Sequence, residues 1–381
     1  MLQTLLIFLL ITPSLGTIFS RKEVFFNHAY WQRYEAYKNA YYSSQYVKEE
    51  APSIIPDEIF NSFAGGFFLL GNNPIHIVHD HPPLGRYLIS LSILIFKNEH
   101  IHIIFWQFLT LLSLYLISKS LIKGKIIALI PLFIFAFEPL YLNQFKYTPL
   151  LEPIQLPFIF LSLYFTHKSI SSKREINFFL TSIFIGLVIT IRFFPLGMLL
   201  YFTWLFSVFI FDKREIKKIL IFSPAILIIL LTAYFKCFLE GYSLRKVLGI
   251  QKYMYEYHKS QLMTPFSAFD LLLFNRWHTW WGERLIASDP QWRIWWPTSF
   301  FLAILSIARI IKENFSIGRL KRYFSRKENS LESVLIAWII IYLTFLSVGQ
   351  TTTRYFFPIL PIFYILAVNS LNKLFKLNTK S

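Results

Sequence analysis

The chain is poor in cysteine and in acidic residues. Its single cysteine, Cys237, excludes an intramolecular disulfide and a metal cluster held by several thiolates. Its 21 Asp and Glu residues face 38 Lys and Arg residues, which gives a formal net charge of +17. Nucleic-acid binding would explain such an excess. The basic residues instead form short clusters between apolar runs, so they indicate anionic lipid headgroups and topogenic signals.

Internal repeats, low-complexity tracts and familiar metal-binding patterns are also missing from the 381 residues. The histidines between His76 and His102 are irregularly spaced and match no common zinc pattern. We therefore expect no metal and no resident cofactor.

Apolar and aromatic residues are abundant instead. The sequence is 55% hydrophobic, with 42 Phe, 21 Tyr and 10 Trp. Repeated apolar runs near bilayer-spanning length predict an all-α polytopic membrane protein with about ten transmembrane helices. The first run, residues 1–19, is interpreted as a membrane helix, with a cleaved signal peptide as the alternative. The other predicted spans are 101–119, 126–143, 153–166, 177–192, 196–211, 219–237, 295–311, 332–348 and 355–371.

The apolar run over residues 83–96 decides the predicted topology. Its roughly 14 residues are fewer than the ~17–25 that a spanning helix needs, so we expect it to lie in the interface, with Pro82 and Pro83 at its start. The strong basic clusters between the remaining spans then all lie on the cytosolic side, as the positive-inside rule requires. The outer side holds residues 20–100, 146–152, 238–294 and 349–354.

The whole chain, 1–381, reads as one integral-membrane domain. We divide it into the first helix (1–19), the first outer loop (20–100), a helix bundle (101–237), a long outer loop (238–294) and C-terminal helices (295–381). Tyrosines between Tyr30 and Tyr46 predict an amphipathic interfacial stretch. Ala64-Gly65-Gly66 and Gly71-Asn72-Asn73-Pro74 read as turns.

The adjacent carboxylates Asp57 and Glu58 follow Pro56 in the first outer loop. An acidic pair after proline is typical of a helix N-terminus. In a partly dry cleft such a carboxylate can also accept a proton from a hydroxyl that becomes a nucleophile. Both interpretations remain open from the residues alone.

The segment from Asp80 to Arg86, Asp-His-Pro-Pro-Leu-Gly-Arg, is a longer signal. It is explained either as a rigid turn into a helix, with His81 as a polar cap, or as a phosphate site. In the second case His81 and Arg86 lie near a phosphate at the membrane surface, because arginine matches phosphate geometry with two parallel donors.

Further charged residues occur at predicted outer span ends. Glu138 and Glu152 flank the second outer turn, which contains Lys146, and such carboxylates often only reach toward the interface. Arg192 and Arg354 oppose the positive-inside trend, which favours either an anionic substrate or a structural pair with Glu152 or Asp57. The tryptophan-rich residues 277–296 form either an interfacial aromatic belt or a sugar-stacking wall.

These motifs together resemble the protein O-mannosyltransferase family and its relatives among the GT-C glycosyltransferases. The resemblance rests on Asp57-Glu58, on the His-Pro-Pro-Leu-Gly-Arg run from His81 to Arg86, and on the segment from Phe145 to Glu152. The Arg-Tyr-Phe-Phe-Pro sequence from Arg354 is similar to the family's last span. Lys146 and Glu152 depart from the Arg and Asp that the family usually has there. The resemblance is strong over residues 50–165 and thin afterwards, and the sequence is of a compact, prokaryotic type.

The resemblance implies a metal-independent, inverting transfer of a mannose-like sugar from a polyprenyl-phosphate donor. The acceptor would be a hydroxyl of a protein Ser or Thr, a glycan or a lipid on the outer face of the cell membrane. It assigns Asp57 as the base, with Glu58 orienting it or the acceptor. It assigns the substrate site to His81, Arg86, Lys146, Glu152 and Arg354. The alternative is a transporter or flippase for a lipid-linked sugar, which often has inverted repeats.

Overall fold

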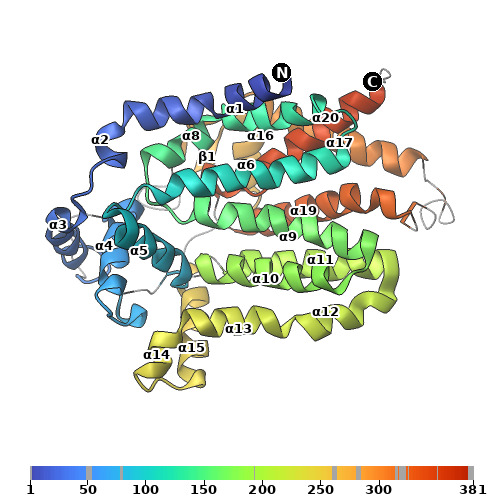
Figure 1. The fold of residues 1–381 in the computed structure, drawn as a ribbon. Helices are drawn as coiled ribbons and strands as arrows, with labels where there is room; N and C mark the ends of the chain where they lie inside the picture. Colours follow the sequence, from blue (N-terminus) through green and yellow to red (C-terminus); the bar gives the residue numbers. More distant parts are fainter. Residues whose placement is uncertain are drawn as a thin grey trace.

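The structure is a computed structural model, and it describes residues 2–48, 54–77, 80–192, 194–259, 264–279, 285–313, 316, 323–324, 326–349 and 351–375. These residues are overwhelmingly helical (Figure 1). The first half contains α1 (Leu2–Ser20), α2 (Lys22–Phe25), α3 (Tyr30–Tyr42), α4 (Asp57–Leu69), η1 (Pro74–His76), α5 (Leu84–Phe96), α6 (His102–Leu121), η2 (Ile127–Leu129), α7 (Ile130–Ala136), α8 (Pro139–Lys146), α9 (Glu152–Ser172) and α10 (Glu175–Ile191).

The second half continues with helices and one short strand pair. Its elements are α11 (Phe194–Asp212), η3 (Lys213–Glu215), α12 (Ile216–Phe222), α13 (Pro224–Ala233), α14 (Phe235–Leu239), α15 (Leu244–Lys259), α16 (Ser267–Phe274), β1 (Trp277–His278), β2 (Ile286–Ala287), α17 (Trp295–Glu313), η4 (Lys327–Asn329), α19 (Ser330–Ser347), η5 (Thr353–Phe356) and α20 (Leu360–Leu374). The strands pair antiparallel. The prediction of an all-α polytopic membrane protein is confirmed.

Each predicted span corresponds to a helix or to a helix broken at a proline or turn. By length and composition, three described helical stretches could cross a membrane: His102–Leu121, Phe194–Ala233 and Lys327–Ser347. A fourth is the pair Ile127–Ala136 and Pro139–Lys146, which is bent by 51°. Leu5–Ser20, Glu175–Ile191 and Leu360–Leu374 are apolar but shorter, as is the predicted interfacial helix Leu84–Phe96. The number of about ten spans stays a prediction.

The helices are arranged so that the first outer loop caps one end of the bundle. α3, α4 and α5 gather at that end, whereas the α9–α10 turn and η3 lie at the opposite end (Figure 1). The basic cluster at Lys173 and Arg174 and the one at Lys213 and Arg214 therefore share the end away from α4. This arrangement agrees with the predicted separation of basic turns from the acidic motif. Arg319, Lys321, Arg322, Lys376 and Lys380, which belong to other predicted cytosolic clusters, lie outside the described residues.

The glycines of α4 correct one prediction. Ala64-Gly65-Gly66 is not a turn but lies inside α4, and all three residues are buried. A Cβ on Gly65 would come within 2.9 Å of Ile93 in α5, and one on Gly66 would collide with the Tyr30 and Tyr34 side chains of α3. Small residues are needed here because both neighbouring helices approach the α4 backbone closely. The second predicted turn is confirmed, with Gly71 at φ +81°.

Candidate active site

The acidic pair begins α4, as the simpler interpretation of the sequence expected. Pro56 precedes the helix with an extended backbone, φ −64° and ψ 148°, and Asp57 and Glu58 occupy the first turn. Carboxylates in this position interact favourably with the helix dipole. Successive helical residues point in directions about 100° apart, so the two carboxylates face different surroundings. Asp57 and Glu58 can therefore each have a further role besides stabilising the start of the helix.

Asp57 meets the far end of the chain. Its Oδ2 lies 2.8 Å from Nη1 of Arg354, which comes from η5, 297 residues later. The Asp57 side chain is 53% exposed, so solvent reaches the carboxylate from its other side. A carboxylate that is held in place by an arginine and still accessible has the geometry that proton acceptance requires.

Glu152 connects this pair to a second arginine. Its Oε1 lies 3.3 Å from Arg354 Nη1 and 3.1 Å from Arg192 Nη2. The negative charge of Glu152, followed by that of Asp57, raises the pKa of Arg354 above its already high value although burial opposes this. The structural pairing that the sequence offered for Arg192 and Arg354 is thus present. It places two cations and two carboxylates in one cluster.

Arg86 is the buried cation of the site. It is 1% exposed, and its Nη2 donates to both oxygens of Asp80 at 3.2 and 3.3 Å. Its Nε donates to Oδ1 of Asn61 at 3.0 Å, and its guanidinium lies 4.5 Å from the centre of the Phe60 ring. Among the described residues, Nη1 of Arg86 is buried without a hydrogen-bond partner. A buried charged donor without a partner is costly, so this atom is suited to receive an anionic ligand.

A small pocket joins these groups. Its free volume is about 10 Å³, roughly the space of one water molecule, so its charges largely satisfy one another. Nε2 of His81 lies 3.7 Å from Asp80 and completes the wall. The lining residues are Asp57, Phe60, Asn61, Asp80, His81, Arg86, Leu151, Glu152 and Arg192.

Two of the predicted site residues face elsewhere. Glu58 and Lys146 line a separate cavity of about 650 Å³ on the other side of the start of α4, and Lys146 does not join the cluster around Asp57. Burial raises the pKa of Glu58, and the nearby charge of Asp57 raises it further. Lys146, at the end of α8, thus lies apart from His81 and Arg86, and its assignment to the substrate site stays a prediction.

Three residues of the cluster were not assigned to the site from the sequence. Asn61 holds α4 to its neighbours, because its Nδ2 also donates to the Pro149 carbonyl oxygen at 3.1 Å. It lies four residues after Asp57 on one helix, and this spacing could have revealed it. Asp80 was visible in its motif but received no role as the partner of Arg86. Arg192 was noticed for its charge at a span end and left out of the site.

The tryptophans and Glu138 form a structural cluster away from this pocket. The indole nitrogens of Trp295 and Trp296 and the hydroxyl of Tyr364 all donate to Oε1 of the fully buried Glu138. These bonds tie α17 and α20 to the break between α7 and α8. Trp296 is fully buried and so contributes to neither a sugar-stacking wall nor a surface belt, whereas Trp295 is 39% exposed and leaves both interpretations open. Residues 280–284 of the same loop lie outside the described residues.

The described residues contain no group of three or more His, Cys, Asp or Glu side chains arranged to hold a metal ion. His100 is committed to Glu99 and to the carbonyl oxygen of Thr148, at 3.1 and 3.0 Å. The expectation of metal-independent chemistry stays a prediction.

Comparison with known proteins supports the resemblance. Residues 80–235 match the family described as dolichyl-phosphate-mannose-protein mannosyltransferase. The match includes His81, Arg86 and Glu152, begins after Asp57 and Glu58, and extends well beyond residue 165, where the resemblance had looked thin. No curated protein matches the chain in sequence.

Among solved structures, the chain is similar to ArnT from Cupriavidus metallidurans in the apo state, with a TM-score of 0.59 and 12% identity. The similarity covers 84% of this chain and 55% of the ArnT chain, so the chain spans about half the length of that protein. At this identity the likeness concerns the fold. The chain is thus an integral membrane protein with a GT-C-type fold that resembles the mannosyltransferase family through residues 80–235.

Proposed function

We propose that the chain is an inverting glycosyltransferase that moves a mannose-like sugar from a polyprenyl-phosphate donor to an acceptor hydroxyl on the outer face of the cell membrane. The observation that carries the proposal is the cluster in which Asp57 lies beside Arg354, Glu152 and Arg192, with a partnerless buried nitrogen of Arg86 in the same pocket. A base and several phosphate-binding cations are the groups that this reaction needs.

The cations would bind the donor phosphate. Arg86 already presents one free donor, and Arg354 and Arg192 would exchange carboxylate contacts for phosphate contacts when the donor enters. Such an exchange releases Asp57 from Arg354 when the phosphate binds. The nearly closed pocket fits this sequence of events, because its charges neutralise one another until a competing anion arrives.

An apolar groove whose lining residues Leu84 and Tyr87 are close to Arg86 in sequence suits the lipid tail of the donor. It has a volume of about 530 Å³ and runs between α5, α10 and α13, with Leu84 and Tyr87 on the α5 side and Lys236 at its edge. A polyprenyl chain can occupy such a groove from the bilayer while its phosphate reaches Arg86. The groove and the charged pocket therefore fit the two halves of one amphipathic donor.

In the proposed step the Asp57 carboxylate accepts the proton of the acceptor hydroxyl. The acceptor oxygen forms a bond to the anomeric carbon of the sugar while the bond from that carbon to the phosphate oxygen breaks. The electron pair of the broken bond leaves with polyprenyl phosphate, which is a stable anion and needs no strong general acid. Holding the reactants and stabilising the phosphate would supply most of the rate enhancement.

A transporter or flippase would place ionisable residues near mid-membrane on broken helices. The charged cluster instead gathers where α4, α5, α9 and η5 meet at one end of the bundle. A purely structural membrane subunit would have no need for an accessible carboxylate such as Asp57 held beside Arg354. Both alternatives are thus less well supported than catalysis.

The proposal is tested with purified protein in proteoliposomes that contain radiolabelled polyprenyl-phosphate mannose and a bacterial membrane extract as the acceptor source. We expect label to move from the donor into a product that resists the mild acid that cleaves polyprenyl-phosphate sugars. Donor that crosses the bilayer without losing its sugar would contradict the proposal and favour the flippase. Polyprenyl-phosphate glucose and polyprenyl-phosphate arabinose in parallel vesicles identify the sugar.

A further inference from the structure

The cavity on the Glu58 side of α4 has no role in the donor site. At about 650 Å³ it is much larger than the pocket beside Asp57. Its walls come from the end of α1, α2, α3, the start of α4, His100 and the end of α8. Glu58 lines the cavity and is next to Asp57 in sequence, so a ligand in the cavity can contact the residue adjacent to the proposed base.

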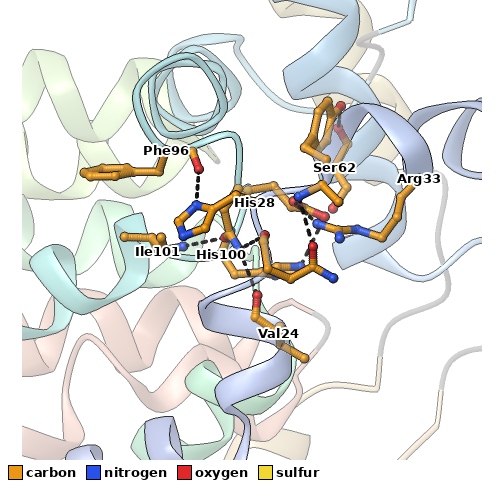
Figure 2. Close-up of polar contacts among 12 residues, drawn as sticks. Val24, His28, Arg33, Ser62, Phe96, His100 and Ile101 are labelled. Carbon is orange, nitrogen blue, oxygen red and sulfur yellow. Dashed lines mark hydrogen bonds and ion pairs between the residues drawn. The ribbon is translucent and has the colours of Figure 1, made fainter.

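One wall of the cavity is fixed by a buried polar network. Glu99 is fully buried and accepts hydrogen bonds from Arg33 Nη2 at 2.9 Å and from the Tyr37 hydroxyl at 2.6 Å, with His100 Nε2 at 3.1 Å. Burial alone would raise the pKa of Glu99, but His100, Tyr37 and Arg33 together lower it to about 2. Figure 2 shows Arg33, His100 and Ser62 gathered around this network. The wall is therefore charged, internally neutralised and rigid.

A second buried residue ties the same wall to the backbone. Nδ2 of Asn98 donates to the carbonyl oxygens of Val24 and Asn27 at 2.8 and 2.7 Å. Its Oδ1 accepts from the backbone nitrogens of His100 and Ile101, and His28 bonds to the Phe96 carbonyl oxygen nearby (Figure 2). These bonds hold α2, the residues between α2 and α3, and the α5–α6 turn together before any ligand arrives.

The remaining charges of the lining are unpaired. Within the part of the chain that the structure describes, Arg21 and Lys146 have no carboxylate within 4 Å, and neither Glu23 nor Glu58 has a cation within that distance. The two cations suit one anionic group. The two carboxylates suit hydrogen-bond donors such as hydroxyls. A ligand that complements all four carries a phosphate flanked by hydroxyl groups.

The residues around one edge of the cavity have the character of a membrane interface. The lining residue Ser20 ends the apolar helix α1, whose Phe19 is 65% exposed, and Arg21 follows it. Phe26 and Trp31, close to the lining residues Asn27 and Arg33 in sequence, are also exposed. Exposed aromatic side chains next to a basic residue at the end of an apolar helix are typical of the membrane interface. A headgroup can therefore enter this cavity while its acyl chains remain in the bilayer.

We infer that this cavity binds an anionic, hydroxyl-bearing lipid headgroup, with the phosphate at Arg21 and Lys146 and a hydroxyl at Glu58. Resting on the proposed function, the inference makes this headgroup the sugar acceptor, since Glu58, which would bind its hydroxyl, is next to Asp57 in the first turn of α4. α4 then separates the donor phosphate on one side from the acceptor phosphate on the other. Two anions are kept apart while the reacting hydroxyl and sugar meet at the helix start.

The test measures binding without any sugar donor. Tyr147 lines the cavity and is 53% exposed, so a Tyr147→Cys variant reports occupancy through its reaction with an impermeant maleimide. Leu239→Cys, 66% exposed on α14, is the matched control, and the native Cys237 is fully buried. Both variants are reconstituted in phosphatidylcholine vesicles alone, with added phosphatidylglycerol, or with added phosphatidylserine.

We expect phosphatidylglycerol to slow the maleimide labelling of Tyr147→Cys several-fold. Leu239→Cys should be labelled at the same rate in phosphatidylglycerol vesicles as in phosphatidylserine vesicles. A Lys146→Gln substitution should remove this protection. Equal slowing at both cysteines, or protection that survives Lys146→Gln, would overturn the inference. Equal protection by phosphatidylserine would contradict the requirement for hydroxyl groups. Protection by free glycerol 3-phosphate or by a Ser/Thr peptide in phosphatidylcholine vesicles would contradict a lipid as the ligand.

Adding polyprenyl-phosphate mannose to the same vesicles separates this inference from the proposed function. Mannosylated phosphatidylglycerol, detected by mass spectrometry, supports both. Protection without any sugar transfer to a lipid or another acceptor keeps the binding site and contradicts the glycosyltransferase. Sugar transfer to another acceptor, without protection of Tyr147→Cys by phosphatidylglycerol, supports the glycosyltransferase and contradicts the lipid-binding site.

Discussion

The two sides of the start of α4 differ in size and in how their charges are satisfied. On the Asp57 side, a pocket of about 10 Å³ contains arginines already paired with carboxylates. On the Glu58 side, a cavity of about 650 Å³ contains Arg21 and Lys146, which have no such partner among the described residues, against a wall neutralised by Glu99. Under the proposed function, Asp57 belongs to a closed site that must exchange ion pairs, and the adjacent Glu58 belongs to an open site that is ready to bind.

The largest effect on stability is expected from removing the negative charge of Glu99, which holds the wall of the cavity on the Glu58 side. Glu99→Gln leaves Arg33 and His100 without their carboxylate. Because the folded-state pKa of Glu99 is about 2 and its ordinary value is 4.5, the ionised form contributes about 3 kcal/mol of stability at neutral pH. We expect a lower midpoint of thermal unfolding in detergent.

The pH dependence of this loss follows from the depressed pKa. The contribution of Glu99 is fully present above pH of about 4.5 and is lost as the pH falls toward 2. The stability difference between wild type and Glu99→Gln should therefore narrow in acid. Glu35→Gln is the control, because Glu35 is 67% exposed and only forms a surface pair with Lys38. A similar loss in both variants would show that the wall is not specially stabilised.

A smaller effect, on catalysis, is expected from Arg86→Lys. Lysine keeps the charge opposite Asp80 but cannot also supply the donor that Arg86 Nη1 offers. Losing one charge-assisted hydrogen bond to phosphate costs about 1.5–3 kcal/mol, or roughly 10–100-fold in kcat/KM for the donor. Arg293→Lys should have no such effect, because among the described residues the Arg293 guanidinium bonds only the backbone oxygens of Pro290 and Trp292. Unchanged donor kinetics in Arg86→Lys would remove it from phosphate binding.

The smallest effect is expected from Arg354→Gln. Arg354 is 33% exposed, so water weakens its ion pairs, and its loss should raise the donor KM by about 5-fold. The same change frees Asp57 from its partner, so kcat should fall less than kcat/KM. Steady-state transfer at varied donor concentration separates the two constants. A fall in kcat alone, with an unchanged KM, would mean that Arg354 positions Asp57 and does not bind phosphate.

The sequence predicts the fold well because its signals are local. Apolar runs of bilayer length and clusters of basic residues depend on neighbouring residues, so the helices between residues 101 and 371 fall where expected. The glycine pair at Gly65 and Gly66 misled because small residues fit both a turn and a close helix contact. Only the position of Tyr30 and Ile93 against α4 distinguishes these two uses.

The candidate site could be predicted in part. Motifs that touch the same ligand are visible as unusual charges, which is why Asp57, Arg86, Glu152 and Arg354 were found. The side of a helix on which a residue lies depends on its rotation about the helix axis. Lys146 ends α8 and faces the opposite cavity, and nothing in its neighbouring residues indicates that direction. Asn61 was missed because its contacts, to Arg86 and Pro149, come from distant parts of the chain.

The claim that α4 separates a catalytic face from an acceptor-binding face is tested most directly by comparing Asp57→Asn with Glu58→Gln in the same proteoliposome transfer assay. The account predicts that Asp57→Asn folds normally and lowers kcat by roughly 10²–10⁴-fold, as the loss of a general base does. It predicts that Glu58→Gln keeps kcat within a few-fold and raises the acceptor KM. Undiminished transfer by Asp57→Asn, or equal losses of kcat in both variants, would contradict it.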